Sequence, residues 1–338
     1  LFRCQKMTLL TVEDLNVKFD TDEGRITAVE NVSFEINAGE VLGLVGESGS
    51  GKTVTAKSLM RLNPSNAVYS SESGIHLDLE SGVVEVLSLK SSRELEIVRG
   101  GAISMIFQEP MASFAPAITI GNQMVEQLLI HTSLSKRECS ELSVEMLERV
   151  GIDEAGKRFY QYAFELSGGM RQRAMIAMAL STKPKLLIAD EPTTALDVTI
   201  QAQVLDLMKD LVSEFGMAIL FITHDLGVIA QVADRVAVMY LGGIVESGPV
   251  REVLKSPAHP YTRGLINALP KIDSLDEPLT PIPGDIPSPL ERPSGCVFHT
   301  RCPEVLADRC DSSVPQRIIL GHGHSASCFA IDSKEKTA

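Results

Sequence analysis

The stretch GESGSGKT, from Gly46 to Thr53, constrains the fold of this chain more than any other segment. It follows the pattern G-x-x-x-x-G-K-[ST], in which glycines let the backbone curl so that its N–H groups face phosphate oxygens. The apolar run EVLGLVG before it predicts a strand, and Thr53 to Leu62 after it predict a helix. Because the N-terminal end of a helix attracts anions, this layout indicates a phosphate-binding loop. The residues expected to contact a nucleoside triphosphate are Gly46, Glu47, Ser48, Gly49, Ser50, Gly51, Lys52 and Thr53.

A second pattern, LLIADEP, predicts a buried strand that ends in two adjacent acids, Asp190 and Glu191. An isolated acid pair is also compatible with a solvated turn, but phosphoryl transfer needs such carboxylates for charge neutralisation and positioning. We expect Lys52 to neutralise the β- and γ-phosphates and Thr53 to offer its hydroxyl to Mg²⁺. Asp190 is expected to bind the same Mg²⁺, directly or through water, and Glu191 to polarise the attacking water. The two patterns together predict an active nucleotide hydrolase.

The order of apolar patterns indicates an α/β core around a mostly parallel sheet, because strands alternate with helices. Residues 8 to 45 alternate apolar and polar positions around an acidic turn, Asp20 to Gly24, and predict β-structure. Residues 63 to 100 are weakly patterned, and we expect a mostly β excursion there. Helices are predicted within 119 to 150, 167 to 181 and 198 to 214, and further buried strands at KLLIADEP and AILFITHD.

The segment LSGGMRQR, Leu166 to Arg173, resembles the signature sequence of ABC ATPases. The resemblance implies that Ser167, Gly168 and Gly169 contact the γ-phosphate of ATP held by an opposite subunit, so hydrolysis requires a dimer. It also implies the fold: a P-loop ABC cassette with a mixed sheet core, an antiparallel β subdomain and a helical subdomain. A small Cys-rich C-terminal extension would complete the α/β chain.

Shorter motifs follow in the order that this family shows. Gln108 in MIFQEP matches the residue that reaches Mg²⁺, Asp197 in TTALD matches the D-loop, and His224 in FITHD matches the residue that contacts the γ-phosphate. Phe19 is a candidate for stacking on adenine, although it is also compatible with a strand residue in the core. The resemblance thus implies that Glu191, His224, Lys52 and Gln108 carry catalysis, with Mg²⁺ at Thr53, Gln108 and Asp190.

A change in composition divides the chain into two expected domains. Residues 8–255 would form the ABC nucleotide-binding domain, with a helical insertion at about 109–180, and residues 256–338 a Pro-rich, Cys-containing extension. The segments SPAHPYTRGLINALP, IPGDIPSP and GCVFHTRCP resemble those of ATP-binding subunits of bacterial oligopeptide and dipeptide importers. Phe114–Ala115 and residues 65 to 82 depart from the family pattern, which affects the expected partner interface and not the chemistry.

Four of the six cysteines cluster near the C-terminus, whereas Cys4 and Cys139 are isolated and expected to be structural or incidental. In a cytosolic protein such a cluster is more often a metal site than a disulfide framework. Zinc sites usually contain a C-x₂₋₄-C pair, which these spacings lack, and Pro303 follows one cysteine as in some iron–sulfur sites. The family resemblance implies a [4Fe–4S] cluster; zinc, free thiols or a disulfide are the alternatives. The implied ligands are Cys296, Cys302, Cys310 and Cys328, with His299, His322 and His324 as possible substitutes or as solvated loop residues.

The formal net charge of −13 argues against nucleic acid as a partner, because such binding needs a basic face. The start, LFRCQKM, has no apolar core followed by a cleavage site, and Met7 is a candidate start of translation. We therefore expect a cytoplasmic chain, and the family resemblance implies that it binds peripherally to the inner face of the membrane. The resemblance implies a second, related ATPase subunit as a heterodimer partner, two integral permease subunits and an extracytoplasmic solute-binding protein. Alternative functions are import of nickel or another small solute, and a soluble ABC ATPase without a permease.

Overall fold

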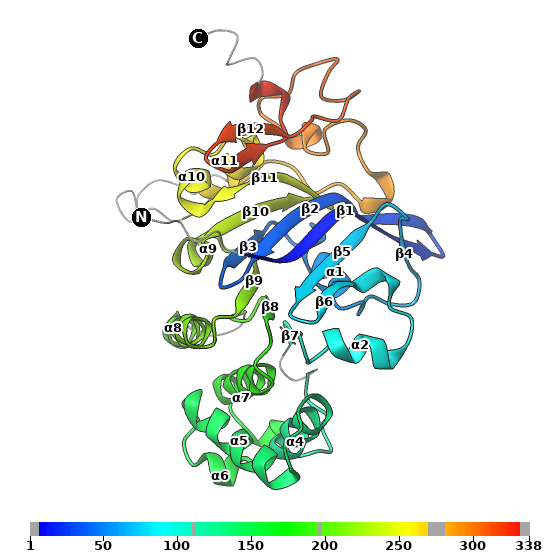
Figure 1. The fold of residues 1–338 in the computed structure, drawn as a ribbon. Helices are drawn as coiled ribbons and strands as arrows, with labels where there is room; N and C mark the ends of the chain where they lie inside the picture. Colours follow the sequence, from blue (N-terminus) through cyan, green and yellow to red (C-terminus); the bar gives the residue numbers. More distant parts are fainter. Residues whose placement is uncertain (1–6, 110–112, 195–197, 270–280, 332–338) are drawn as a thin grey trace. The chain divides into compact units, whose positions relative to one another are not determined.

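The computed structural model describes residues 7–109, 113–194, 198–269 and 281–331 (Figure 1). The chain divides into two compact units, which are described separately below. Unit 1 comprises residues 1–10, 36–40 and 76–222, and unit 2 comprises residues 11–35, 41–75 and 223–338. Within the described residues, no helix is long and apolar enough to cross a bilayer.

Three parallel strands form the centre of unit 1: β7 (Ile103–Ile106), β8 (Leu186–Asp190) and β9 (Ala218–Thr223). Every residue of these strands is buried. Burial on both faces explains why KLLIADEP and AILFITHD are continuous apolar runs rather than alternating ones. The predicted strands are confirmed, and they bring the acid pair to the carboxyl end of β8.

Helices make up most of the rest of unit 1, and Figure 1 shows α4, α5, α6 and α7 gathered into one bundle. Three of them begin at a capping side chain. Thr119 accepts a hydrogen bond from Asn122 N–H, Ser135 forms a capping box with Glu138, and Ser167 accepts from Met170 N–H. The predicted helices are confirmed in this unit. They are α4 (Ile120–His131), α5 (Lys136–Arg149), α7 (Gly168–Ser181) and α8 (Val198–Phe215). The short helix α6 (Ala155–Arg158) was not predicted.

The segment expected to be mostly β contains a helix that the prediction missed. Strands β5 (Gly74–Leu79) and β6 (Gly82–Glu85) form a hairpin, but a 3₁₀ turn and helix α2 (Ser92–Val98) follow. Ser91 caps α2 and shares a capping box with Glu94. The spacing S-x-x-E is a helix-start signal that outweighs the weak apolar pattern of this segment.

Unit 2 contains most of the antiparallel hairpin of β1 (Thr8–Thr21) and β2 (Gly24–Asn37), which turn at the predicted acidic segment. Strand β4 (Ala67–Tyr69) pairs antiparallel with β1. A second group of strands runs in the order β12-β13-β11-β10-β3, in which only β3 and β10 are parallel. These strands are β3 (Val41–Val45), β10 (Arg235–Tyr240), β11 (Gly243–Pro249), β12 (Ile318–Gly321) and β13 (His324–Ala326).

Short helices complete unit 2. Helix α1 (Lys52–Ser58) follows the phosphate-binding loop as predicted, but turns replace the helix before the expected end at Leu62. In the described residues of the Pro-rich segment, the α-helix is α11 (Pro260–Asn267), which begins with proline, where a missing N–H costs nothing. The other helices are α9 (Leu226–Val232) and α10 (Val250–Lys255).

Candidate functional site

The loop between β3 and α1 has the tight geometry that its glycines predict. A Cβ on Gly46 would lie 2.2 Å from the carbonyl oxygen of Met239, and one on Gly51 would lie 2.6 Å from that of Ala28. Gly51 also has φ +97°, a left-handed conformation that L side chains rarely adopt. Glycine is therefore required at both positions, because the loop packs directly against neighbouring backbone.

Lys52 lies at the start of α1 and is 5% exposed. Its Nζ donates hydrogen bonds to the carbonyl oxygens of Gly46 at 2.7 Å and Glu47 at 2.9 Å, and to Ser50 Oγ at 3.3 Å. The loop thus curls around the ammonium group and fixes its position. Thr53, the next residue, is half-buried in the first turn of the helix.

The acid pair lies at the carboxyl end of β8. Asp190 is the last residue of the strand and is 2% exposed, whereas Glu191 adopts φ 49° just beyond it. Gln108 Nε2 and Thr194 Oγ1 each donate to Glu191 Oε2, both at 3.0 Å. The structure therefore brings together two predicted site residues, Gln108 and Glu191, and adds Thr194, whose contact the sequence analysis missed.

The signature segment begins helix α7. Ser167 is its N-cap and accepts a hydrogen bond from Met170 N–H at 3.3 Å. Ser167 and Gly168 are exposed, and a Cβ on Gly168 would meet no atom within 4 Å. Further along, Gln172 is buried and donates to the carbonyl oxygen of Pro192, which ties the signature helix to the residues after the acid pair.

The remaining predicted residues are distributed over both units. His224 is exposed directly after β9, in unit 2, which also contains the loop with Lys52. Phe19 is half-buried on β1 opposite Ala67 of β4, so its side chain is neither a core residue nor fully exposed. Asp197 lies outside the described residues.

The four C-terminal cysteines lie in one region of unit 2, all at least half-buried. Cys296 N–H donates to the carbonyl oxygen of Cys310 at 2.7 Å. Burial, together with the neighbouring cysteines, raises the pKa of the Cys296 and Cys302 thiols to about 11. However, among the described residues no group of three His, Cys, Asp or Glu side chains is arranged to hold a metal ion. The predicted iron–sulfur or zinc site is thus not shown.

One suggested substitute ligand has another partner. His324 Nε2 lies 2.7 Å from Glu246 Oε1, and both side chains are buried. Because an ionised carboxylate only accepts hydrogen bonds, the His324 Nε2–H group donates a hydrogen bond to Glu246. His324 is therefore a structural residue of β13 and not a solvated loop residue.

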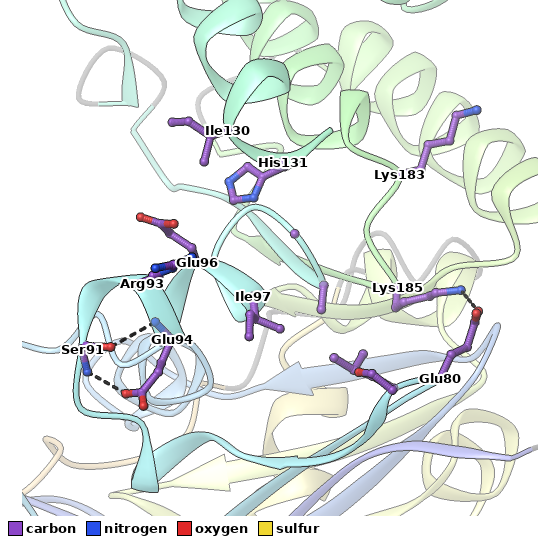
Figure 2. A pocket seen from close by; sticks show the side chains of 14 residues that line it. Glu80, Ser91, Arg93, Glu94, Glu96, Ile97, Ile130, His131, Lys183 and Lys185 are labelled. Atoms are coloured by element: carbon purple, nitrogen blue, oxygen red, sulfur yellow. Dashed lines mark hydrogen bonds and ion pairs between the residues drawn. The ribbon is translucent and has the colours of Figure 1, made fainter. Parts of the chain in front are cut away.

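An open pocket of about 950 Å³ lies elsewhere in unit 1, between β5, α2 and the end of α4 (Figure 2). Its lining carries both signs of charge, and Lys185 Nζ is paired with Glu80 Oε1 at 3.0 Å. His131 lies against Gly100, and burial lowers its pKa. None of the predicted site residues lines this pocket, so it is distinct from the phosphate-binding loop and the acid pair.

The site defines the class of the chain as a P-loop ATPase of the ABC type. Its features are a glycine loop that curls around a lysine, an acid pair at a strand end and a signature helix with an exposed start.

A family model for ABC transporters matches residues 29–194, and one for the C-terminal region of oligopeptide and dipeptide transporters matches residues 245–310. Curated relatives match over nearly the whole chain. The oligopeptide transport ATP-binding protein OppD of Salmonella typhimurium is 48% identical over 95% of this chain and 93% of its own. The dipeptide transport ATP-binding protein DppD of Bacillus subtilis is 44% identical over 98% and 97%.

A solved structure supports the same class. The ATP-binding cassette MJ0796, in a dimeric post-hydrolysis state bound to ADP and Pi, has a TM-score of 0.63 and 25% identity, and the match covers 72% of this chain and 99% of that one. The chain belongs to the ATP-binding subunits of oligopeptide and dipeptide ABC transporters, and it is an ABC transporter ATPase.

Two residues near the loop escaped the sequence analysis. Tyr261 of α11 and Arg301 both contact Glu47 of the phosphate-binding loop. The only signal for them is their place in the segments SPAHPYTRGLINALP and GCVFHTRCP, which mark the family and do not indicate a contact.

Proposed function

We propose that this chain binds MgATP in the loop Gly46 to Thr53 and that hydrolysis drives the import of short peptides through a membrane complex. The observation that supports hydrolysis best is the fixed position of Glu191, which Gln108 and Thr194 hold at the end of a buried strand. The match of residues 245–310 to the peptide-transporter C-terminal region supports the cargo.

The residues divide the work of phosphoryl transfer, which depends on positioning and charge neutralisation. Lys52 neutralises the β- and γ-phosphates, and Glu191 orients the attacking water. His224 contacts the γ-phosphate, and Phe19 stacks on the adenine. As water attacks the γ-phosphorus and the bond to the β–γ bridging oxygen breaks, negative charge builds up on the β-phosphate of the leaving ADP. The fixed ammonium of Lys52 stabilises this charge without reorganisation.

Magnesium fits the oxygen groups available in this chain. Thr53, Gln108 and Asp190 would hold it, and the buried carboxylate of Asp190 is the hard ligand that Mg²⁺ prefers. When bound, the ion neutralises phosphate charge.

A second subunit completes the site in this proposal. Ser167, Gly168 and Gly169 of one subunit close over ATP held by the other, and Asp197, the D-loop residue, contributes to nucleotide binding. The exposure of Ser167 and Gly168 at the start of α7 supports this role, since a helix N-terminus attracts anions such as phosphate. The partner is a related ATPase chain, and the pair acts beneath two permease subunits on the cytoplasmic face, with a solute-binding protein outside.

We also propose a [4Fe–4S] cluster at the four C-terminal cysteines. Three of the four are buried and Cys302 is half-buried, and their side chains would have to rearrange to hold the metal. A cluster there would stabilise a segment with little apolar core of its own. Anaerobic purification should give about four iron atoms per chain. Stoichiometric zinc without iron, or neither metal, would reject the cluster.

Peptide uptake by reconstituted transporter tests the main proposal. Lys52→Ala and Glu191→Gln should abolish ATP-dependent uptake of a labelled di- or oligopeptide, whereas Lys57→Ala, on the same helix but outside the loop, should not. Uptake of nickel or a glycoside in place of peptides would show that the cargo is wrong. Full peptide uptake by Lys52→Ala would refute the ATPase role.

A further inference from the structure

The phosphate-binding loop contains a charged residue whose partners lie in the C-terminal extension. Glu47 follows the first glycine of the loop, and its side chain is about a quarter exposed. Its carboxylate forms a two-pronged ion pair with Arg301: Nη1 donates to Oε2 at 2.8 Å and Nη2 to Oε1 at 3.2 Å. The two residues are separated by 254 positions in the sequence.

The same residue is held a second time through its backbone. Glu47 N–H donates to Tyr261 Oη at 2.9 Å, and Tyr261 is fully buried on α11. Its ring packs against the rings of Tyr240 and Phe298, at centroid distances of 4.7 Å and 5.4 Å. The Tyr261 hydroxyl therefore has little freedom to move, and it occupies an N–H group of the loop.

Arg301 is itself rigidly placed. Its side chain is 4% exposed, and besides Glu47 it donates to the carbonyl oxygens of Pro283 at 3.0 Å and Ile282 at 3.4 Å. One guanidinium thus joins the Pro-rich segment to the phosphate-binding loop. The planar fork of arginine suits this task, because it makes several hydrogen bonds in fixed directions.

The backbone carbonyl of Glu47 links the contacts with Arg301 and Tyr261 to the phosphate-binding lysine, Lys52. Its carbonyl oxygen accepts a hydrogen bond from Lys52 Nζ at 2.9 Å, so the residue held by Arg301 and Tyr261 also positions the phosphate-binding lysine. In addition, a bare carboxylate in a loop that binds a polyanion is unfavourable, because like charges repel. Arg301 neutralises that carboxylate.

From these contacts we infer that Arg301 and Tyr261 of the C-terminal extension are positioning residues for ATP: they hold Glu47, and through it Lys52, in the geometry that binds the triphosphate. The inference rests on the proposed role of the loop Gly46 to Thr53. It assigns the extension a function at the nucleotide site, in addition to any function at its cysteines.

Binding of a slowly hydrolysed ATP analogue with Mg²⁺ to the full-length chain tests the inference. Arg301→Gln should raise the Kd about tenfold, which corresponds to about 1.4 kcal/mol. Adding Glu47→Gln to Arg301→Gln should restore the Kd to within about threefold of wild type, because the pair is again neutral. A residue that only stabilised the fold would not be rescued in this way.

Matched variants separate the outcomes. Arg263→Gln removes another ion pair of the extension, with Glu304 at 2.7 Å, and should leave the Kd unchanged. Tyr261→Phe keeps the buried ring and removes only the hydroxyl, so it decides the question if Arg301→Gln does not fold; we expect about threefold weaker binding. A folded Arg301→Gln with wild-type Kd, or no rescue by Glu47→Gln, would overturn the inference. If wild type and Lys52→Ala bind equally, the proposed function fails instead.

Discussion

A buried carboxylate in β11 should determine the stability of the C-terminal part of unit 2. Glu246 is 1% exposed and accepts three hydrogen bonds: from Ala258 N–H at 2.8 Å, His259 N–H at 2.8 Å and His324 Nε2 at 2.7 Å. These partners precede α11 and belong to β13. One side chain therefore connects three segments that are distant in the sequence.

The cost of removing this carboxylate follows from its partners. Glu246→Ala leaves two backbone N–H groups and one ring nitrogen without an acceptor, at about 1–3 kcal/mol for each buried group. Allowing for partial access of water, we expect the free energy of local unfolding to fall by about 4 kcal/mol. Glu246→Gln retains the shape and one acceptor oxygen, so about 2 kcal/mol is expected.

Hydrogen exchange measured by mass spectrometry is the suitable assay, because a chain with two units does not guarantee two-state unfolding. Amides of α11 should exchange about a thousandfold faster in Glu246→Ala, the factor that corresponds to about 4 kcal/mol. Glu35→Ala, an exposed glutamate of β2, is the control and should change exchange little. Wild-type protection of α11 in Glu246→Ala would refute the assigned role.

Three further predictions concern the loop, the acid pair and pH. Gly46→Ala should abolish MgATP binding in calorimetry, because its Cβ would meet the Met239 carbonyl oxygen at 2.2 Å, whereas Gly156→Ala, with no atom within 4 Å, should bind normally. Gln108→Ala should lower kcat for ATP hydrolysis about tenfold with little change in KM, and an unchanged kcat would contradict its role at Glu191. Burial lowers the pKa of His259 to about 3 in the folded chain. Between about pH 6.5 and 3 the unfolded chain therefore binds one more proton than the folded chain, so the free energy of unfolding falls as the pH falls through this range. His259→Asn should therefore lose less stability than wild type on acidification from pH 6.5 to 4 in urea titrations, and equal losses would count against this cause.

The elements that the sequence predicted well are those with strong local signals. Continuous apolar runs predicted β8 and β9, and the glycine pattern predicted the turn before α1. In both cases residues adjacent in the sequence determine the burial or the curvature of the backbone. Helix α2 was missed although its capping box was visible, since its apolar pattern is weak and it follows the strands β5 and β6 closely in the sequence.

The contacts that hold the site were beyond prediction from local patterns. Arg301 reaches Glu47 across 254 positions, and Glu246 reaches His324 across 78. Nothing in the composition near these residues distinguishes a buried ion pair from a solvated charge. Only the packing of β11, α11 and the C-terminal strands, which brings the segments together, determines these partners.

The most direct measurement of the central claim is magnesium-dependent ATP turnover by the assembled transporter carrying Glu191→Gln. The proposal assigns the orientation of the attacking water to Glu191 and phosphate binding to Lys52 and the loop. Turnover should therefore fall about a thousandfold or more while the affinity for MgATP stays near that of wild type. Turnover at the wild-type rate in this variant would contradict the account.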